Sequence, residues 1–162
     1  MRLTSKTQYG VRALYDLAFH GRGQATQAKE IADRQSIPLR YLEQILQDLK
    51  RAGIIEAKRG PRGGYALTRP ADAIHLGEIL RALRGALEDL FTLDGMPPVP
   101  ERKAARKGAD LPGDDDIPAL VWHDVIARLV EVLDSVTLQD FVDRAEAAGV
   151  KRAVVQPQMY FI

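Results

Sequence analysis

The side chains with the most recognisable chemistry lie on one face of a predicted helix in the first half of the chain. Arg40, Glu43 and Gln44 follow one another at helical spacing. An arginine can donate two hydrogen bonds to guanine and a glutamine can form two with adenine, and each good pair discriminates by about 1–3 kcal/mol. Glu43 can accept a hydrogen bond from cytosine or exclude other bases. These residue types at this spacing predict contacts to base edges in the major groove of DNA.

The opposite face of this segment is apolar and predicts a helix that packs on a core. Pro38 suits its first turn, because the missing N–H of proline costs nothing there. Gly53 is expected to end the helix, since glycine readily adopts the left-handed conformation of the C′ position. The apolar side chains recur at helical intervals, at Leu42, Ile45, Leu46 and Leu49.

The next segment predicts a β-hairpin with a basic, glycine-rich tip. Ile54 and Ile55 lead into the turn-forming residues 58–64, and residues 65–67 form the return strand. A helix followed by such a ribbon has the outline of a winged helix-turn-helix, whose second helix enters the major groove. The arginines of the tip are expected to reach the backbone or a narrow minor groove. The expected DNA contacts of this wing are Arg59, Pro61, Arg62, Gly63 and Gly64. The alternative is a helix packed on a hairpin whose charges only keep the chain soluble.

The distribution of charge favours the DNA-binding interpretation. Residues 1–70 hold 13 Lys and Arg against 6 Asp and Glu, a net charge of +7, whereas residues 71–162 hold 10 against 16, a net charge of −6. The whole-chain charge of +1 conceals this asymmetry. A basic half joined to an acidic half suits a polyanion-binding domain carried by a separate assembly or sensing domain.

Composition excludes several kinds of chemistry. The 162 residues include no cysteine, which excludes disulfides, thiolate catalysis and thiolate-ligated metal clusters. His20, His75 and His123 are scattered and belong to no obvious acid–base constellation, so we expect neither an enzyme nor a metal or cofactor site. No apolar run approaches 18 residues and no apolar signal segment stands near the N-terminus, so we expect a cytoplasmic chain without a membrane span.

Two helical patterns precede the DNA-contacting helix. Thr4 or Ser5 can cap a first helix that runs to about His20. Thr26 is expected to cap a short second helix, and residues 35–37 form the tight turn of the helix-turn-helix pair.

The second half of the chain contains helical patterns on both sides of a polar segment. A helix is expected over residues 76–83. Residues 94–116 hold four Pro, four Lys and Arg and six Asp and Glu, which predicts an exposed loop. Its aspartates at 114–116 are expected to be solvated and to favour the N-terminus of the next helix rather than to hold a cation.

A regular amphipathic helix over residues 118–133 predicts a dimer interface. Two-fold protein symmetry would match a palindromic operator, and the alternative is that the stripe packs wholly within one chain. Thr137 with Asp140 then predicts a capped last helix to about Ala148. The apolar stripe comprises Trp122, Val125, Ile126, Leu129, Val130 and Leu133.

Together these patterns predict a mainly α fold with a small β wing. We expect a winged helix-turn-helix DNA-binding domain over residues 1–85, a flexible loop over 86–117, dimerisation helices over 118–148 and a C-terminal tail over 149–162. The tail ends in the apolar residues Met159, Tyr160, Phe161 and Ile162. Such a peptide can bind a partner through its free carboxylate and last side chain, or it can pack on its own dimer.

Several short motifs stand together at fixed spacing. They are MRLTSK (residues 1–6), Tyr9-Gly10, YLEQ (41–44), KRAG (50–53) and RGPRGGY (59–65). In combination they resemble the signature of the Rrf-two (Rrf2) family of bacterial winged-helix transcription regulators. The likeness is close over residues 1–85 and resumes at residues 120–122 and 133–140.

This resemblance implies the winged-helix fold and DNA binding. By analogy, Thr4 and Lys6 would contact phosphates. Tyr41 is expected to contact phosphate too, with a place in the core as the alternative. Many members carry three cysteines in the loop that corresponds to residues 94–116 and sense through an iron–sulfur cluster. This chain has no cysteine, so cluster sensing is not implied.

Within the family, the chain is most similar to the CymR type, cluster-free repressors of cysteine-metabolism genes whose aromatic-rich tail ends in isoleucine. The resemblance implies that the tail docks on cysteine synthase (O-acetylserine thiol-lyase), whose active site accepts C-terminal isoleucine peptides. We therefore expect a homodimeric repressor of sulfur and cysteine metabolism genes that binds double-stranded DNA and is gated by this partner. The alternative is a regulator of the same family that senses a small molecule without an enzyme partner.

Overall fold

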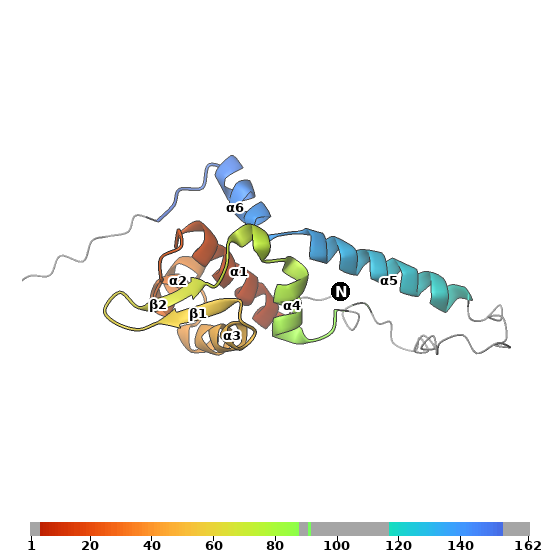
Figure 1. Cartoon of the computed structure of the whole chain (residues 1–162), viewed down its shortest axis with the longest axis horizontal. Helices are drawn as coiled ribbons and strands as arrows, with labels where there is room; N and C mark the ends of the chain where they lie inside the picture. Colours follow the sequence, from red (N-terminus) through yellow and green to blue (C-terminus); the bar gives the residue numbers. More distant parts are fainter. Residues whose placement is uncertain (1–3, 88–90, 92–116, 154–162) are drawn as a thin grey trace, which may run out of the picture.

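Three helices and a two-stranded hairpin form the body of the molecule, and one long helix extends away from it (Figure 1). The structure, a computed structural model, describes residues 4–87, 91 and 117–153. Its elements are α1 (Ser5–Phe19), α2 (Ala28–Gln35), α3 (Leu39–Arg51), β1 (Ile55–Lys58), β2 (Gly64–Leu67), the 3-10 turn η1 (Ala71–Ala73), α4 (Leu76–Arg84), α5 (Ile117–Ser135) and α6 (Leu138–Ala147). The prediction of a mainly α fold with a β wing is confirmed.

The start of α1 follows from a local hydrogen bond. The hydroxyl of Thr4 accepts a hydrogen bond from the backbone N–H of Thr7, which satisfies one of the free donors of the first turn. The predicted Thr4 cap is confirmed.

The predicted cap of α2 is wrong. The N-cap residue is Gln27, and no side chain caps this helix. Thr26 is buried and instead exchanges two backbone hydrogen bonds with Tyr65 of the hairpin, at 2.9 and 2.8 Å. Gly64 permits this approach, because a Cβ there would lie 2.3 Å from the carbonyl oxygen of Thr26. Because Thr26 is held in this bridge with the hairpin, the helix begins after the next residue, Gln27.

The helix predicted to contact DNA is present with the expected boundaries. Pro38 is the N-cap residue of α3, and Gly53 follows the helix with φ +74°. All four predicted apolar side chains of α3 are fully buried, at Leu42, Ile45, Leu46 and Leu49. One face of α3 is therefore fixed in the core, and the other is left to solvent.

The hairpin forms as predicted. β1 and β2 pair antiparallel, with Ile55 opposite Leu67 and Lys58 opposite Gly64. The hydroxyl of Thr68 donates to the backbone carbonyls at the end of α3, 2.7 Å from Gly53 O and 3.0 Å from Ile54 O. The base of the wing is thereby tied to the end of α3, the helix predicted to contact DNA.

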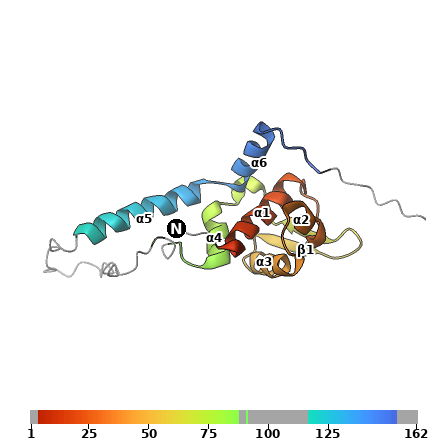
Figure 2. The same cartoon turned by 180° about the vertical axis from the view of Figure 1, so that it is seen from behind.

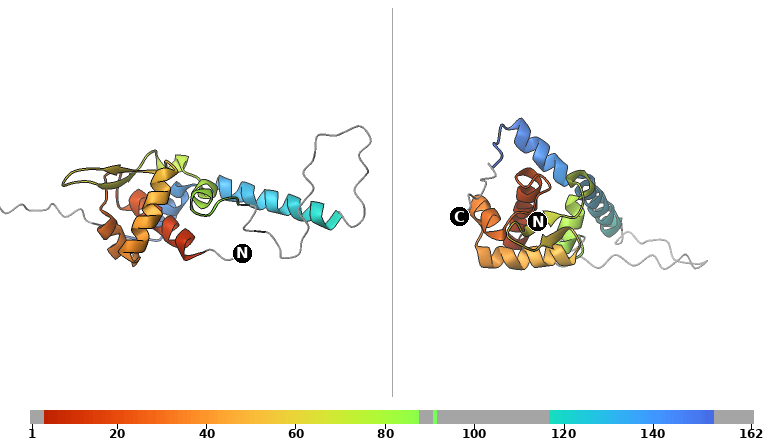
Figure 3. Two further views of the ribbon diagram at one scale, coloured as in Figure 1. Left: turned by 90° about the horizontal axis from the view of Figure 1, so that it is seen from below. Right: turned by 60° about the vertical axis from the view of Figure 1, so that its left-hand side comes forward.

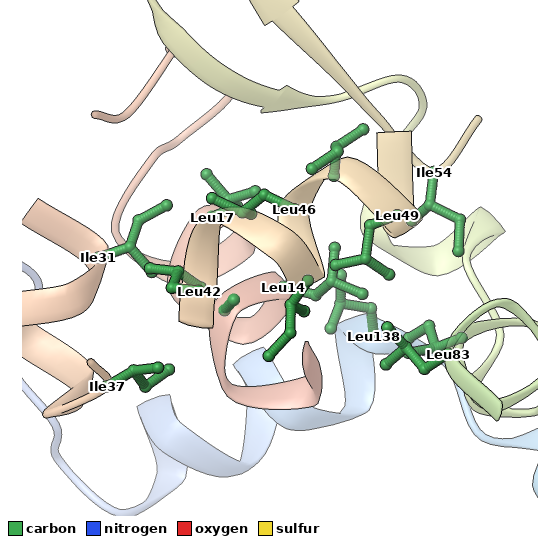
Figure 4. Close-up of a cluster of buried hydrophobic side chains, with 14 of the residues drawn as sticks. Leu14, Leu17, Ile31, Ile37, Leu42, Leu46, Leu49, Ile54, Leu83 and Leu138 are labelled. Carbon is green, nitrogen blue, oxygen red and sulfur yellow. The ribbon is translucent and has the colours of Figure 1, made fainter. Parts of the chain in front are cut away.

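The core lies between α1, α2, α3 and the base of the hairpin, and α4 and α6 close it (Figure 4). α1 and α4 pack closely, because a Cβ at Gly10 would lie 2.3 Å from a methyl group of Leu83. Fully burying one such aliphatic side chain stabilises the fold by about 1.5–3 kcal/mol. The labelled members of the cluster are Leu14, Leu17, Ile31, Ile37, Leu42, Leu46, Leu49, Ile54, Leu83 and Leu138.

The C-terminal helices attach to the body through several contacts, among them Val130 and Leu133 of α5 packed against Leu80 and Leu87. Arg81 of α4 forms two hydrogen bonds with the Asp134 carboxylate of α5, at 2.6 and 2.7 Å. The chain then turns back, and α6 lies on the end of α1, as Figure 2 shows from behind. Thr137 and Asp140 form the predicted capping box at the start of α6.

The predicted domain boundaries stay predictions. α6, which we grouped with the dimerisation helices, packs Val142 and Ala145 against Phe19, and Leu138 belongs to the main core. The loop predicted over residues 94–116 lies outside the described residues. Among the described helices, none is long and apolar enough to span a membrane.

A buried ion pair fixes α2 on α1. The side chain of Asp16 is fully buried and accepts hydrogen bonds from Arg34 Nε at 3.0 Å, from Arg34 Nη2 at 2.7 Å and from Gln35 Nε2 at 3.0 Å. Arg12 also donates to the backbone carbonyl of Gln35. These contacts hold the first helix of the helix-turn-helix pair against α1.

Replacing Arg34 with methionine tests this arrangement. The Arg34→Met variant leaves the buried Asp16 carboxylate without its cation, and removal of one partner of a buried pair costs about 3–5 kcal/mol. Because the Arg34 side chain is 25% exposed, we expect a loss of unfolding free energy near the lower end, about 3 kcal/mol, in urea denaturation. Glu30→Gln is the control. It removes only the exposed partner of Arg34 at 3.9 Å and should cost less than about 1 kcal/mol. Equal small losses of unfolding free energy in both variants would contradict the role of Arg34 as the cation that compensates Asp16.

Candidate nucleic-acid interface

The solvent-facing side of α3 carries the predicted base-contacting residues. Arg40, Glu43 and Gln44 are all exposed, opposite the buried leucines of the same helix. Residues four apart on a helix are neighbours, so Arg40 and Gln44 lie side by side. Figure 3 (left) shows the molecule from below, with α3 in front and the hairpin extending beside it. The geometry leaves these hydrogen-bonding groups free to enter a groove.

The wing presents two exposed arginines. Arg59, Pro61 and Arg62 are exposed at its tip, whereas Gly63 and Gly64 are half-buried. A Cβ at Gly63 would lie 2.3 Å from the carbonyl oxygen of Lys58, so a side chain there would prevent the turn from closing. Gly63 and Gly64 therefore shape the wing by allowing close backbone approaches.

From the sequence, Tyr41 is expected either to contact phosphate or to pack in the core, and it lies at the edge of the core. Its ring is half-buried against the core and meets Tyr9 edge to face, with the ring centroids 5.8 Å apart. The guanidinium of Arg12 lies 5.7 Å from the Tyr9 ring centroid. The aromatic pair thus helps to seat the start of α3 on α1 while part of Tyr41 remains accessible.

The two residues predicted on α1 have partners within the chain. Thr4 serves as the N-cap. Lys6 Nζ lies 2.7 Å from a carboxylate oxygen of Asp48, an α3 residue that sequence reasoning missed. Asp48 also binds Arg51 at 3.1 Å. The hydrogen bond from Lys6, with added Coulombic attraction from Lys6 and Arg51, holds the pKa of Asp48 below its usual value. The opposite charges of Lys6 and Asp48 are visible in the sequence. Their separation along the chain gives no indication that the two side chains meet.

The predicted dimer-interface residues share one side of α5. Trp122, Ile126, Val130 and Leu133 are half-buried, while Val125 and Leu129 are exposed at 37% and 38%. None of the 19 residues of α5 is fully buried within the chain. Further exposed apolar side chains of this helix are Ile117, Leu120, Val121 and Val132.

The predicted partner-binding tail, Met159 to Ile162, lies outside the described residues. The segment just before it is held on α1. Arg152 Nη1 donates to the carbonyl of Phe19 at 2.6 Å, with its guanidinium 4.6 Å from the centroid of that ring. The backbone N–H of Ala153 donates to His20 Nδ1 at 2.8 Å, and burial lowers the pKa of His20, which favours the neutral ring this bond needs.

A helix-turn-helix pair with a basic wing defines a winged-helix DNA-binding protein. Residues 3–144 match the family model Rrf2, described as an iron-dependent transcriptional regulator. The chain belongs to this Rrf2 family of transcriptional regulators.

Named relatives agree with this assignment. The chain is 41% identical to the HTH-type transcriptional regulator slr0846 of Synechocystis sp., over 86% of each chain. It is 32% identical to the regulator IscR of Escherichia coli, over 93% of this chain and 85% of IscR. The structure is similar to that of CymR, the global cysteine regulator of B. subtilis, with a TM-score of 0.69, 30% identity and coverage of 89% of this chain and 98% of CymR. These relatives are named as regulators, not as enzymes.

The iron dependence in the family description finds no matching ligands here. The sequence has no cysteine to bind an iron–sulfur cluster. In the parts of the chain that the structure describes, no three His, Asp or Glu side chains gather to hold a metal ion. His20 and His75 lie at helix caps, and His123 is exposed on α5. The residues present therefore do not fit a thiolate-bound cluster.

The Lys6–Asp48 pair generates a prediction about affinity. Asp48→Asn removes a negative charge from α3 and frees Lys6 for a phosphate. We expect tighter binding to specific and random DNA alike, with the salt dependence of log K steeper by about one. Fluorescence anisotropy over a salt series measures both. Asp143→Asn on α6 gives the same change of net charge away from α3 and should leave binding unchanged. Weaker binding by the Asp48→Asn variant would contradict this prediction. It would show that Asp48 holds Lys6 in position for a phosphate contact instead of competing with the phosphate.

Proposed function

We propose that this chain is a homodimeric transcription regulator that binds a palindromic operator, with α3 in the major groove and the wing on the backbone or in the minor groove. The observation that carries the proposal is the exposed row Arg40, Glu43 and Gln44, held by the buried face of the same helix beside the basic wing. Rigid support of this kind lets side chains reach base edges without first becoming ordered.

Dimerisation through α5 completes this proposal. An amphipathic helix normally buries its apolar stripe, yet α5 buries no residue completely within one chain. Contiguous exposed apolar patches mark interaction sites. A second copy is the partner proposed, because two-fold symmetry places two α3 helices on the two halves of a palindrome.

The regulated genes and the signal form a finer proposal. We propose that the chain represses genes of sulfur and cysteine metabolism and that cysteine synthase gates it by binding the C-terminal tail. The absence of cluster-binding cysteines and the likeness to CymR, a global cysteine regulator, support it. An apolar tail with a free carboxylate suits a site that binds amino-acid carboxylates.

A second candidate signal is a small anion. An open hollow of about 490 Å³ lies between the end of α1, the base of the wing and α6. Its charged lining residues are Arg22, Arg69 and Arg152, of which Arg69 already pairs with Glu78 and Arg152 with Glu146. Small-molecule sites commonly occupy about 300–1,000 Å³. A small carboxylate or phosphate ester would suit this hollow.

The division of labour between α3 and the wing is testable by two substitutions. Arg40→Ala should cost about 1–3 kcal/mol at one base position and relax specificity there. Arg59→Ala should weaken binding evenly across sequences and flatten the salt slope by about one. Competition binding with single-base operator variants separates the two effects. Equal losses on specific and random DNA for both variants would contradict the proposed roles.

Dimerisation is testable with a charge on the stripe. Leu129→Asp should give a monomer at micromolar concentration and reduce operator affinity at least tenfold, since a buried unpaired charge is costly. Light scattering coupled to size exclusion measures the mass. Ala127→Asp puts the same charge on the opposite side of α5 and should remain dimeric. A monomeric wild-type chain at this concentration would refute the dimer.

The tail is tested by peptide titration into cysteine synthase of the same organism. A peptide ending in QPQMYFI should bind with micromolar or tighter affinity and compete with O-acetylserine. The same peptide without Ile162 should not bind, because it lacks the side chain and correctly placed carboxylate. If neither peptide binds, the partner proposal fails, and ligand-dependent melting shifts of the full chain would then test the hollow.

A further inference from the structure

One large apolar side chain on α3 faces solvent. Leu39 is 40% exposed, and among described residues 4–87 it is the one large aliphatic side chain in the exposed class. The others are Ile117, Leu120, Val121, Val125, Leu129, Val132 and Val150, on α5 or after α6. An isolated exposed leucine is common on protein surfaces. What distinguishes Leu39 is its position on the helix.

Leu39 occupies the end of α3 that enters a groove. It is the first residue of the helix. In helix-turn-helix proteins the N-terminal residues of the second helix contact base edges. Side chains of a helix tilt toward its N-terminus, so a side chain at the first position projects ahead of the helix.

Leu39 also shares its face with the proposed base contacts. It precedes Glu43 by four residues, which places the two side chains on one row, and Arg40 is its exposed neighbour. The buried face of α3 begins with Leu42, which points into the core. Leu39 thus belongs to the outward row and not to the packed one.

We propose that Leu39 contacts the 5-methyl group of a thymine and so determines specificity at one base pair of each half-site. The thymine methyl is the apolar group that the major groove offers, and a leucine has neither a donor nor an acceptor for any other base edge. The contact would remove apolar surface of both groups from water. It would add an apolar determinant beside the hydrogen-bonding pair Arg40 and Gln44. This inference rests on the proposed placement of α3 in the major groove.

The test is a thermodynamic cycle on a single methyl group. An operator is first selected from random DNA with the full-length wild-type chain. Each thymine is then replaced in turn by deoxyuridine, which removes the methyl and keeps every hydrogen-bonding group. Burial of one methyl is worth about 0.8 kcal/mol, so a uracil in one half-site should weaken wild-type binding about fourfold, and one in each half-site about fifteenfold. In Leu39→Ala the same replacement should have no effect.

Two variants serve as controls. Leu39→Met keeps an apolar side chain of similar volume and should keep the preference for thymine over uracil. The Arg40→Ala variant should bind more weakly but keep the preference for thymine, because Arg40 is proposed to contact a different base. An unchanged melting temperature of Leu39→Ala establishes that the exposed substitution leaves the fold intact.

Each remaining outcome decides the matter. If no thymine shows a methyl effect, or if Leu39→Ala retains the effect, the proposed contact is wrong. If no operator can be selected at all, the proposed DNA-binding function fails, and this inference fails with it.

Discussion

The position of the helix-turn-helix pair depends on one buried carboxylate. Asp16 stands on α1 with no exposed surface, and its hydrogen bonds go to Arg34 and Gln35 at the end of α2. A buried charge is destabilising unless it is paired and hydrogen-bonded. α2 therefore has to lie where Arg34 and Gln35 reach the Asp16 carboxylate. Ser36 then adopts a left-handed conformation and turns the chain into α3. The turn into α3 thus starts from an α2 whose position on α1 is fixed by this buried pair.

A second constraint is that α3 has to satisfy the core and the proposed ligand with the same 13 residues. Leu42, Ile45, Leu46 and Leu49 are inaccessible, which fixes the rotation of the helix about its axis. That rotation leaves Arg40, Glu43 and Gln44 outward as a consequence of packing. A helix held in this way changes its outward residues without changing its placement. The outward row of α3 is therefore free of packing constraints, whereas its inward row is not.

Local features of the chain were predictable from sequence, and long-range ones were not. The Thr4 cap, the end of α3 at Gly53 and the Thr137–Asp140 capping box depend on residues within a few positions of one another. The misassigned cap at Thr26 failed because a hairpin about 40 residues later takes up its backbone. The partners of Asp16 and Lys6 lie about 20 and 40 residues away, and helical periodicity carries no information about such pairs. The exposed row of α3 that we propose to contact DNA followed from periodicity, whereas the internal partner of Lys6 required the structure.

The end of α1 also connects the C-terminal segment to the helix-turn-helix pair. Arg152 and Ala153 bind the backbone of Phe19 and the ring of His20, and α6 packs on the same turn. Asp16 lies on that turn as well, since the backbone N–H of His20 donates to its carbonyl. A displacement of the C-terminal segment therefore acts within one helical turn of the carboxylate that orients α2. The long helix α5 is joined to α4 instead, through Arg81 and Asp134. The C-terminal segment and the proposed dimer contact thus adjoin the body through different helices, α1 and α4.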